Sequence, residues 1–161
     1  MIRHIAAFDE ARGFAKFSYT GILRTPWDLP GDMNYYRSHT GGMPQLMGRM
    51  TFEAIRVPAA SYQYVLSRDP GLCVPNGEVV TSIEEALRKN DGHDLWVIGG
   101  ERVYADTLDV ADELYITQVE GIYECDRFYP PIPSTFARVS VSGPQQENGG
   151  TYWFEVYKRQ K

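Results

Sequence analysis

The sequence is poor in the residues that bind structural metals. Its 161 residues include two cysteines, Cys73 and Cys125, and three histidines that lie far apart, His4, His39 and His93. No Cys-x-x-Cys pair and no His-x-Cys cluster is present, so the spacing argues against a zinc site and we expect no metal. Two unpaired thiols are typical of a reducing compartment, and we expect a cytoplasmic protein.

Two further absences limit the expected partners. No run of 18 or more apolar residues is present, so we expect no membrane-spanning helix. The 21 acidic and 16 basic residues give a net charge of -5, and a basic cluster is found only at Lys158, Arg159 and Lys161. A nucleic-acid-binding protein would show a basic excess or patch. We therefore expect a small-molecule substrate, no nucleic acid, no membrane and a monomer.

Short apolar segments of strand length alternate with segments of helical period. The length and the lack of a linker predict one domain over residues 1–161. The alternation predicts an α/β fold with a mostly parallel central sheet and flanking helices. Asn148-Gly149 is a strong turn signal and predicts a C-terminal antiparallel hairpin. The expected strands are 5–8, 45–47, 64–67, 78–80, 94–98, 114–119, 137–141 and 152–156, and the expected helices are 32–40, 50–55, 83–88 and 102–107.

Two local patterns concern the ends of helices. Residues 9–30 contain several glycines and prolines and show no clear period, so we expect a long irregular loop before the first helix. A loop of that length in a compact domain is usually functional. Ser82 and Glu85 have the spacing of a capping box at the start of a helix.

Glycines and basic residues after the predicted strands form candidate phosphate sites. Gly99-Gly100 follows the strand at 94–98 and opens a helix, where a backbone close to an anion and a simple tight turn give the same pattern. It is not a G-x-G-x-x-G motif, so a standard Rossmann fold is not predicted. Gly48-Arg49-Met50-Thr51 and Ser67-Arg68 combine hydroxyl and guanidinium groups. Two arginines beside a 2′-phosphate would favour NADPH over NADH, and the alternative for each is an ordinary surface charge.

An aspartate lies among aromatic residues at the end of the long loop. Asp32 follows Pro30-Gly31 and is close in sequence to Trp27 and Tyr35-Tyr36. Taken alone, it would be the N-cap of the next helix. Among aromatic groups, its carboxylate is also suited to bind the amidine-like edge of a flat heterocycle through paired charge-assisted hydrogen bonds.

In this order, the segments resemble the dihydrofolate reductase family over nearly the whole chain. The resemblance depends on several modest motifs at near-family spacing. They are Pro26-Trp27-Asp28-Leu29-Pro30-Gly31-Asp32, Met47-Gly48-Arg49-Met50-Thr51-Phe52-Glu53-Ala54-Ile55, Val65-Leu66-Ser67-Arg68, Trp96-Val97-Ile98-Gly99-Gly100, Glu113-Leu114-Tyr115-Ile116-Thr117 and Asp126-Arg127-Phe128-Tyr129-Pro130. The resemblance implies NADPH-dependent reduction of 7,8-dihydrofolate to tetrahydrofolate. In that reaction, nicotinamide C4 transfers hydride to pterin C6 and N5 is protonated from solvent.

The resemblance also implies roles for individual residues. Asp32 is similar to the acid that binds the pterin 2-amino group and ring nitrogen, Thr117 to the threonine that supports it, and Trp27 to a tryptophan that holds an ordered water. A cis peptide is implied between Gly99 and Gly100. The implied substrate pocket is Ile5, Ala6, Asp32, Tyr36, Ile55, Ile98, Tyr104 and Thr117, and the implied cofactor contacts are Ala7, Gly48, Arg49, Thr51, Ser67, Arg68, Ile98, Gly99, Gly100, Arg102, Val103 and Tyr104.

The chain departs from the family pattern in two places. The segment 9–25 is several residues longer than the family's loop over the nicotinamide, which is expected to alter lid closure or cofactor release. Ser61 falls where the family has the arginine that pairs with the folate α-carboxylate, and a serine cannot form that bidentate ion pair. Arg56 or another cation is a candidate substitute.

Two other functions remain open on the sequence alone. A pyrimidine reductase of riboflavin synthesis shares the fold and the strand-Gly-Gly-helix motif, but it does not normally contain Trp-Asp-Leu-Pro-x-Asp. A catalytically silent NADPH- or pterin-binding protein is suggested by Ser61, whereas Trp27, Asp32 and Thr117 argue against it.

Overall fold

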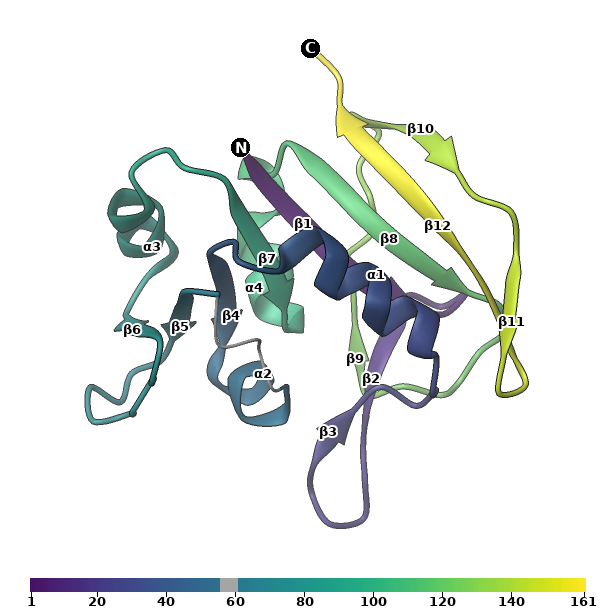
Figure 1. Ribbon diagram of the computed structural model, residues 1–161, viewed down its shortest axis with the longest axis horizontal. Helices are drawn as coiled ribbons and strands as arrows, with labels where there is room; N and C mark the ends of the chain where they lie inside the picture. Colours follow the sequence, from purple (N-terminus) through teal and green to yellow (C-terminus); the bar gives the residue numbers. More distant parts are fainter. Residues whose placement is uncertain (56–60) are drawn as a thin grey trace.

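A large sheet forms the centre of the molecule (Figure 1). The computed structural model describes residues 1–55 and 61–161, so Arg56 lies outside the described residues. The strands are β1 (Ile2–Phe8), β2 (Gly13–Phe17), β3 (Leu23–Arg24), β4 (Gln45–Gly48), β5 (Gln63–Leu66), β6 (Gly77–Val80), β7 (Leu95–Gly99), β8 (Glu113–Val119), β9 (Arg127–Phe128), β10 (Phe136–Val141), β11 (Gln145–Glu147) and β12 (Gly150–Arg159). The helices are α1 (Pro30–Thr40), α2 (Arg49–Ala54), α3 (Ile83–Asn90), α4 (Glu101–Thr107) and the 3-10 helix η1 (Leu108–Val110).

The strand order confirms the predicted fold class. The sheet runs β10-β12-β8-β1-β7-β4-β5-β6, and β11 pairs with β12. The strands from β8 to β6 are parallel to one another. The hairpin strands β10, β11 and β12 are antiparallel additions at one edge. Asn148 and Gly149 both have positive φ, 47° and 80°, which is the geometry that an Asn-Gly hairpin turn requires.

Both faces of the sheet are covered, which explains the continuous apolar character of its central strands. Figure 1 shows α1 crossing one face and α4 behind the sheet. On the α1 side, Ile5 and Met47 pack with Tyr35 and Tyr36. On the other side, Ala6 and Phe8 of β1 belong to a larger cluster that includes residues of α3 and α4. Successive residues of β1 alternate between these two cores, as a pleated strand requires.

The expectation of an irregular loop over residues 9–30 is wrong. Residues 13–17 and 23–24 form the antiparallel strands β2 and β3, and β2 also pairs with β9 far along the chain. The turn between them closes through hydrogen bonds from the Gly21 amide to the Ser18 carbonyl and from the Ser18 amide to the Ile22 carbonyl. Figure 1 shows this hairpin projecting away from the sheet. The glycines and prolines of this segment hid the strands, and β2 pairs with a partner that is distant in the sequence.

The two expectations about helix starts are only partly met. Ser82 accepts the Glu85 amide at 3.1 Å, but the Glu85 carboxylate accepts the Thr81 amide and hydroxyl, so the reciprocal half of the capping box is displaced by one residue. The N-cap interpretation of Asp32 is wrong. Helix α1 begins at Pro30, which is favoured in a first turn, and Asp32 is its third residue.

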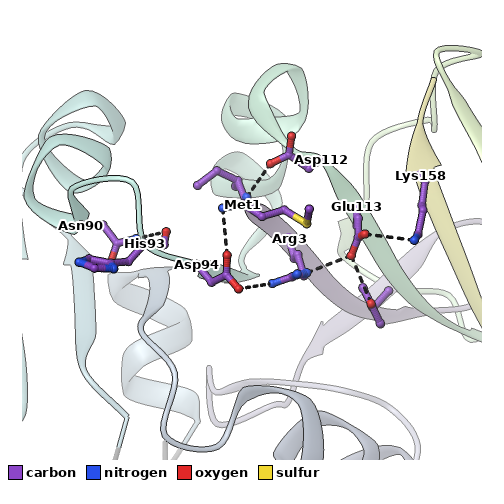
Figure 2. Close-up of polar contacts among 10 residues, drawn as sticks. Met1, Arg3, Asn90, His93, Asp94, Asp112, Glu113 and Lys158 are labelled. Carbon is purple, nitrogen blue, oxygen red and sulfur yellow. Dashed lines mark hydrogen bonds and ion pairs between the residues drawn. The ribbon is translucent and has the colours of Figure 1, made fainter. Parts of the chain in front are cut away.

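A charged network joins four strands at the amino ends of the parallel strands (Figure 2). The Met1 amino group and the Arg3 guanidinium both contact the Asp94 carboxylate at 3.0 Å. Arg3 also binds Glu113 at 2.9 Å, and Lys158 lies 3.5 Å from Glu113. Arg3 and Glu113 are largely shielded from water, with side-chain exposures of 19% and 10%, so their pair is screened less than a surface pair. The network fixes the register of β1, β7, β8 and β12.

His4 is fully buried on the α4 side of the sheet. Its Nδ1 lies 2.7 Å from the Tyr129 hydroxyl and its Nε2 lies 2.8 Å from the Thr107 hydroxyl. Thr107 itself donates to the Val103 carbonyl at 2.6 Å, so Nε2 donates to Thr107 and Nδ1 accepts from Tyr129. The imidazole is therefore neutral, and burial lowers its pKa to about 3. In the part of the chain that the structure describes, no helix is long and apolar enough to cross a membrane.

This buried imidazole predicts acid destabilisation. In the native state His4 stays neutral, whereas the unfolded chain takes up a proton near pH 6.5, so stability is lost as the pH falls from that value towards 3. We expect the free energy of unfolding to fall by about 2 kcal/mol between pH 6.5 and pH 5 from this group. Urea unfolding at both pH values measures it. The His4→Gln variant should show a smaller fall, and an equal fall in both proteins would contradict the assignment.

Candidate active site

A cavity of about 610 Å³ opens at the carboxyl ends of the parallel strands. Ligands in open α/β sheets bind at this edge. Strands β1 and β7 supply its floor, helices α1, α2 and α4 its walls, and β2 and β3 part of its cover. The residues singled out from the sequence that line it are Ile5, Ala6, Ala7, Trp27, Asp32, Tyr36, Thr51, Ile55, Ile98, Gly99, Gly100 and Tyr104.

Asp32 is anchored beside this cavity by a residue from the centre of the sheet. The Thr117 hydroxyl of β8 donates to Asp32 Oδ1 at 2.7 Å. Thr117 is buried, with 1% of its surface exposed, and lies beneath the carboxylate rather than among the residues that line the cavity. The sequence paired these two residues across 85 positions only through the family resemblance, and the structure confirms that they are in contact.

The surroundings of Asp32 make its carboxylate easier to protonate than an exposed one. Burial raises the pKa of Asp32, and the negative charge of Glu147 raises it further. The hydrogen bond from Thr117 acts in the opposite direction, because it stabilises the ionised form. A titratable carboxyl group with a raised pKa in a cleft is typical of a functional site.

Two tyrosines shape the wall next to β1 and β7. The Tyr104 hydroxyl donates to the Ile5 carbonyl at 2.7 Å, and burial raises the pKa of this phenol, so it stays protonated. The Tyr36 hydroxyl donates to Gln45 Oε1 at 2.5 Å. Both rings are thereby held against the sheet, which leaves a flat, largely apolar slot above Ile5 and Ile98.

Trp27 brings a polar donor to the same cavity. Its indole Nε1 is buried and has no hydrogen-bond partner among the described residues. Its ring packs edge-on against Tyr123, with centroids 5.2 Å apart. A buried N–H without a protein partner is usually satisfied by an ordered solvent molecule.

The glycine pair after β7 meets the start of α2. The Gly99–Gly100 peptide is cis, as the resemblance implied. Gly99 has φ of 128°, a backbone conformation that residues with a Cβ rarely adopt, so a glycine is needed there. It lies beside Thr51 Oγ1 and the Tyr104 ring. Gly48 is packed against Val103, with a Cβ position 3.4 Å from its methyl carbon. Val103 is buried in the core and supports this turn from behind.

The two phosphate motifs predicted from the sequence meet on one side of the cavity. Arg49 Nη1 lies 3.2 Å from Asp69 Oδ2, and the Asp69 amide donates to Ser67 Oγ at 3.1 Å. Arg49 and Arg68 are both exposed. Gly48 and Gly100 are the N-cap residues of α2 and α4, and in the described residues neither N-cap makes a side-chain hydrogen bond to its helix. Glycine turns, uncapped amides and arginines together fit a dinucleotide with phosphate groups.

Arg102 is the least engaged of the predicted cofactor residues. Its side chain is 87% exposed and its guanidinium lies 3.7 Å from Asp106 on the same helix. Neither Arg102 nor Arg49 is among the cavity-lining residues.

Several residues that line the cavity were missed in the sequence. Met33 and Arg37 are separated by one helical turn and flank Asp32 and Tyr36 on α1, so helical spacing was a usable signal. The residues of the long N-terminal segment offered no such signal, because their positions depend on pairing between β2 and β9. The missed residues are Phe14, Ala15, Leu23, Arg24, Thr25, Met33, Arg37, Met50 and Ala54.

Ser61 is turned into the protein rather than towards a ligand. It is fully buried, and its hydroxyl donates to the Thr40 carbonyl at 3.3 Å and accepts the Gly42 amide at 3.2 Å. Ser61 therefore stabilises the chain at the end of α1 and is not available to a ligand. Among the described residues, the cations that line the cavity are Arg24 and Arg37.

The Thr117 contact predicts the direction of a pKa change. In Thr117→Val the ionised Asp32 loses its hydrogen-bond donor, so we expect the pKa of Asp32 to rise above its wild-type value. Titration of the Asp32 side-chain carbon by ¹³C NMR measures it. Thr151→Val, at a partly buried position on β12, is the matched control. A lower pKa in Thr117→Val would contradict the assigned direction of the hydrogen bond.

A family model described as dihydrofolate reductase matches residues 1–159. Dihydrofolate reductase of Staphylococcus aureus strain Mu50 is 35% identical over 107 residues, 66% of this chain and 66% of that protein. The match thus spans about two thirds of the Staphylococcus protein. Dihydrofolate reductase of Aedes albopictus is 29% identical over 161 residues, covering 83% of this chain and 87% of that protein.

The structure has a close neighbour of known fold. Dihydrofolate reductase from Enterococcus faecalis, complexed with NADP(H) and RAB-propyl, superposes with a TM-score of 0.88 and 27% identity. The alignment covers 100% of this chain and 97% of the neighbour. The family match over residues 1–159, the sheet order and the Asp32–Thr117 pair agree, and the chain belongs to the dihydrofolate reductase family.

Proposed function

We propose that the chain is an NADPH-dependent oxidoreductase that reduces 7,8-dihydrofolate to 5,6,7,8-tetrahydrofolate. The observation that carries this proposal is the carboxylate of Asp32, held by Thr117 in a largely apolar slot between α1 and the sheet. A pterin is flat and presents a 2-amino group beside a ring nitrogen, which two carboxylate oxygens can bind together. Membership of the family and the solved neighbour's complex with NADP(H) support the same reaction.

The residues of the chain divide the work between binding and orientation. When bound, NADPH supplies the hydride that passes from nicotinamide C4 to pterin C6. Asp32 holds the opposite edge of the pterin, and its negative charge favours the protonated, electron-poor ring. Ile5, Ile98 and Tyr104 hold the flat surfaces of the slot and exclude water. The Trp27 indole N–H donates to a solvent molecule at the polar edge, and N5 takes its proton from solvent.

The phosphate side of the site is assigned to the cofactor. The turns at Gly48 and Gly99-Gly100 bring backbone close to the diphosphate, with Thr51 beside them. Arg49, Ser67 and Arg68 bind the 2′-phosphate, since the contact of Arg49 with Asp69 places its guanidinium at the Ser67–Asp69 turn.

The tail of the substrate requires a different cation from the one usual in the family. Ser61 is buried and already bonded within the protein. We assign the tail carboxylates to the end of the cavity lined by Arg37, with Arg24 on the opposite hairpin. The two cysteines are free, which is compatible with the expected cytoplasmic location.

Removing the charge of Asp32 tests the reaction. In Asp32→Asn, the amide oxygen can still accept the Thr117 hydrogen bond, so we expect an unchanged melting temperature. Turnover of dihydrofolate at pH 7 should fall by about 100-fold or more, because the ionised partner of the pterin is lost. Steady-state loss of NADPH absorbance measures it, with the exposed Asp109→Asn as the control. Equal turnover in wild type and Asp32→Asn would refute the role of Asp32. If the wild-type protein reduces an aminopyrimidine ribityl phosphate but not dihydrofolate, it is a pyrimidine reductase instead.

The arginines predict cofactor preference. Arg68→Gln removes a guanidinium that we assign to the 2′-phosphate, so KM for NADPH should rise about tenfold while KM for NADH stays nearly constant. Arg88→Gln, an exposed arginine on α3, is the matched control. A rise in both KM values by the same factor would mean that Arg68 binds a part of the cofactor that NADPH and NADH share. No change in either KM would mean that Arg68 does not contact the cofactor.

A further inference from the structure

The C-terminal hairpin holds the residues that lead into Asp32. Asn148, in the turn between β11 and β12, donates through Nδ2 to the Asp28 carbonyl at 2.9 Å. The Gly31 amide donates to Glu147 Oε1 at 2.8 Å. These contacts lie on either side of Leu29, which is buried against Val119 and Tyr152. The hairpin therefore fixes the chain up to the residue directly before Asp32.

Glu147 supplies a helix cap from a distant part of the sequence. The amides of a first helical turn have no partner within the helix, and Leu29 at the start of α1 provides no side-chain cap. The Glu147 carboxylate takes that place at Gly31, where a negative charge also interacts favourably with the helix dipole. The approach is close, because a Cβ on Gly31 would lie 2.7 Å from Glu147 Oε1.

The same carboxylate oxygen is held by a buried side chain. The Tyr152 hydroxyl donates to Glu147 Oε1, and Tyr152 is fully buried on β12. The hydroxyl also lies 3.2 Å from Gln145 Oε1. Glu147 is thus fixed from the sheet side by Tyr152 and from the helix side by Gly31, and it has little freedom to turn away from the first turn of α1, which contains Asp32.

We propose that Glu147 is a positioning residue for the reaction at Asp32, because its carboxylate anchors the amide that precedes Asp32 and adds a second negative charge beside it. This inference rests on the proposed function for its catalytic meaning, although the contacts themselves do not. Two carboxylates close together resist joint ionisation, so Glu147 widens the pH range in which Asp32 is protonated.

The other groups that face Asp32 come from four elements. Thr117 of β8 donates to it, and the phenols of Tyr35 on α1, Tyr104 on α4 and Tyr152 on β12 lie within electrostatic reach. The phenols stay neutral at physiological pH, since burial raises the pKa of each. Glu147 is therefore the charged group among these neighbours that acts on Asp32.

The charge effect is tested with Glu147→Gln. The glutamine keeps an oxygen that accepts from Gly31 and Tyr152 but removes the charge, so the ¹³C NMR titration of Asp32 should move to lower pH. The pH profile of turnover should change with it, while the melting temperature stays the same. The control is Glu84→Gln, an exposed glutamate on α3. An Asp32 titration identical to wild type in Glu147→Gln would overturn the electrostatic part of the proposal.

The anchoring effect is tested with Glu147→Ala, which removes both acceptor and charge. We expect hydrogen exchange of the Gly31 amide to accelerate about tenfold and KM for dihydrofolate to rise. Unchanged Gly31 exchange would overturn the anchoring part. If the alanine variant does not fold, Gly31 exchange in Glu147→Gln decides instead: a neutral acceptor binds the amide more weakly than a carboxylate, so exchange should accelerate by a smaller factor, and exchange equal to wild type would overturn the anchoring. Both NMR readouts are independent of turnover. An inactive wild-type protein with the expected shifts would refute only the proposed reaction.

Discussion

The hydrogen bond between Thr117 and Asp32 is the contact on which the site depends. A carboxylate beside an apolar cavity is costly unless its oxygens are bonded, and a serine or threonine from the central sheet is a rigid donor. The bond joins the first turn of α1 to β8, so it fixes the position of the helix as well as that of the acid. In the described residues no hydrogen bond reaches the second carboxylate oxygen, and Asp32 lines a slot whose walls are set by Tyr36, Tyr104 and the cis turn after β7.

The two ends of the parallel strands have different roles. At the amino ends of the parallel strands, Arg3 and Glu113 are the centre of a charged network that sets the register of four strands (Figure 2). At the carboxyl ends lie the glycine turns before α2 and α4 and the carboxylate of Asp32, which Thr117 holds in place. Their polar groups are the ones that a ligand can bind. The buried His4 network lies between the two ends and carries no charge. This separation keeps the network of Arg3 and Glu113 at the opposite end of the parallel strands from Asp32.

Local signals in the sequence predicted much of the fold but less of the site. Apolar segments marked the parallel strands, and Asn148-Gly149 marked the hairpin, because both patterns act over a few residues. The strands β2 and β3 were missed because glycines and prolines surround them, and β2 pairs with β9, which lies more than 100 positions away. Glu147 was missed for the same reason: nothing near it in sequence indicates that its carboxylate meets Gly31. The family resemblance identified Asp32 and Thr117 as partners, but it did not reveal that Ser61 faces inward.

The most direct test of the account is to follow the transferred hydrogen. The wild-type protein would be given NADPH deuterated at the nicotinamide C4 and dihydrofolate in ordinary water, and the product examined by mass spectrometry and NMR. The account predicts one deuterium per tetrahydrofolate, located on C6, with hydrogen from solvent on N5. Product without deuterium, or with deuterium at another carbon, would contradict the orientation of the two rings that the Asp32 slot imposes.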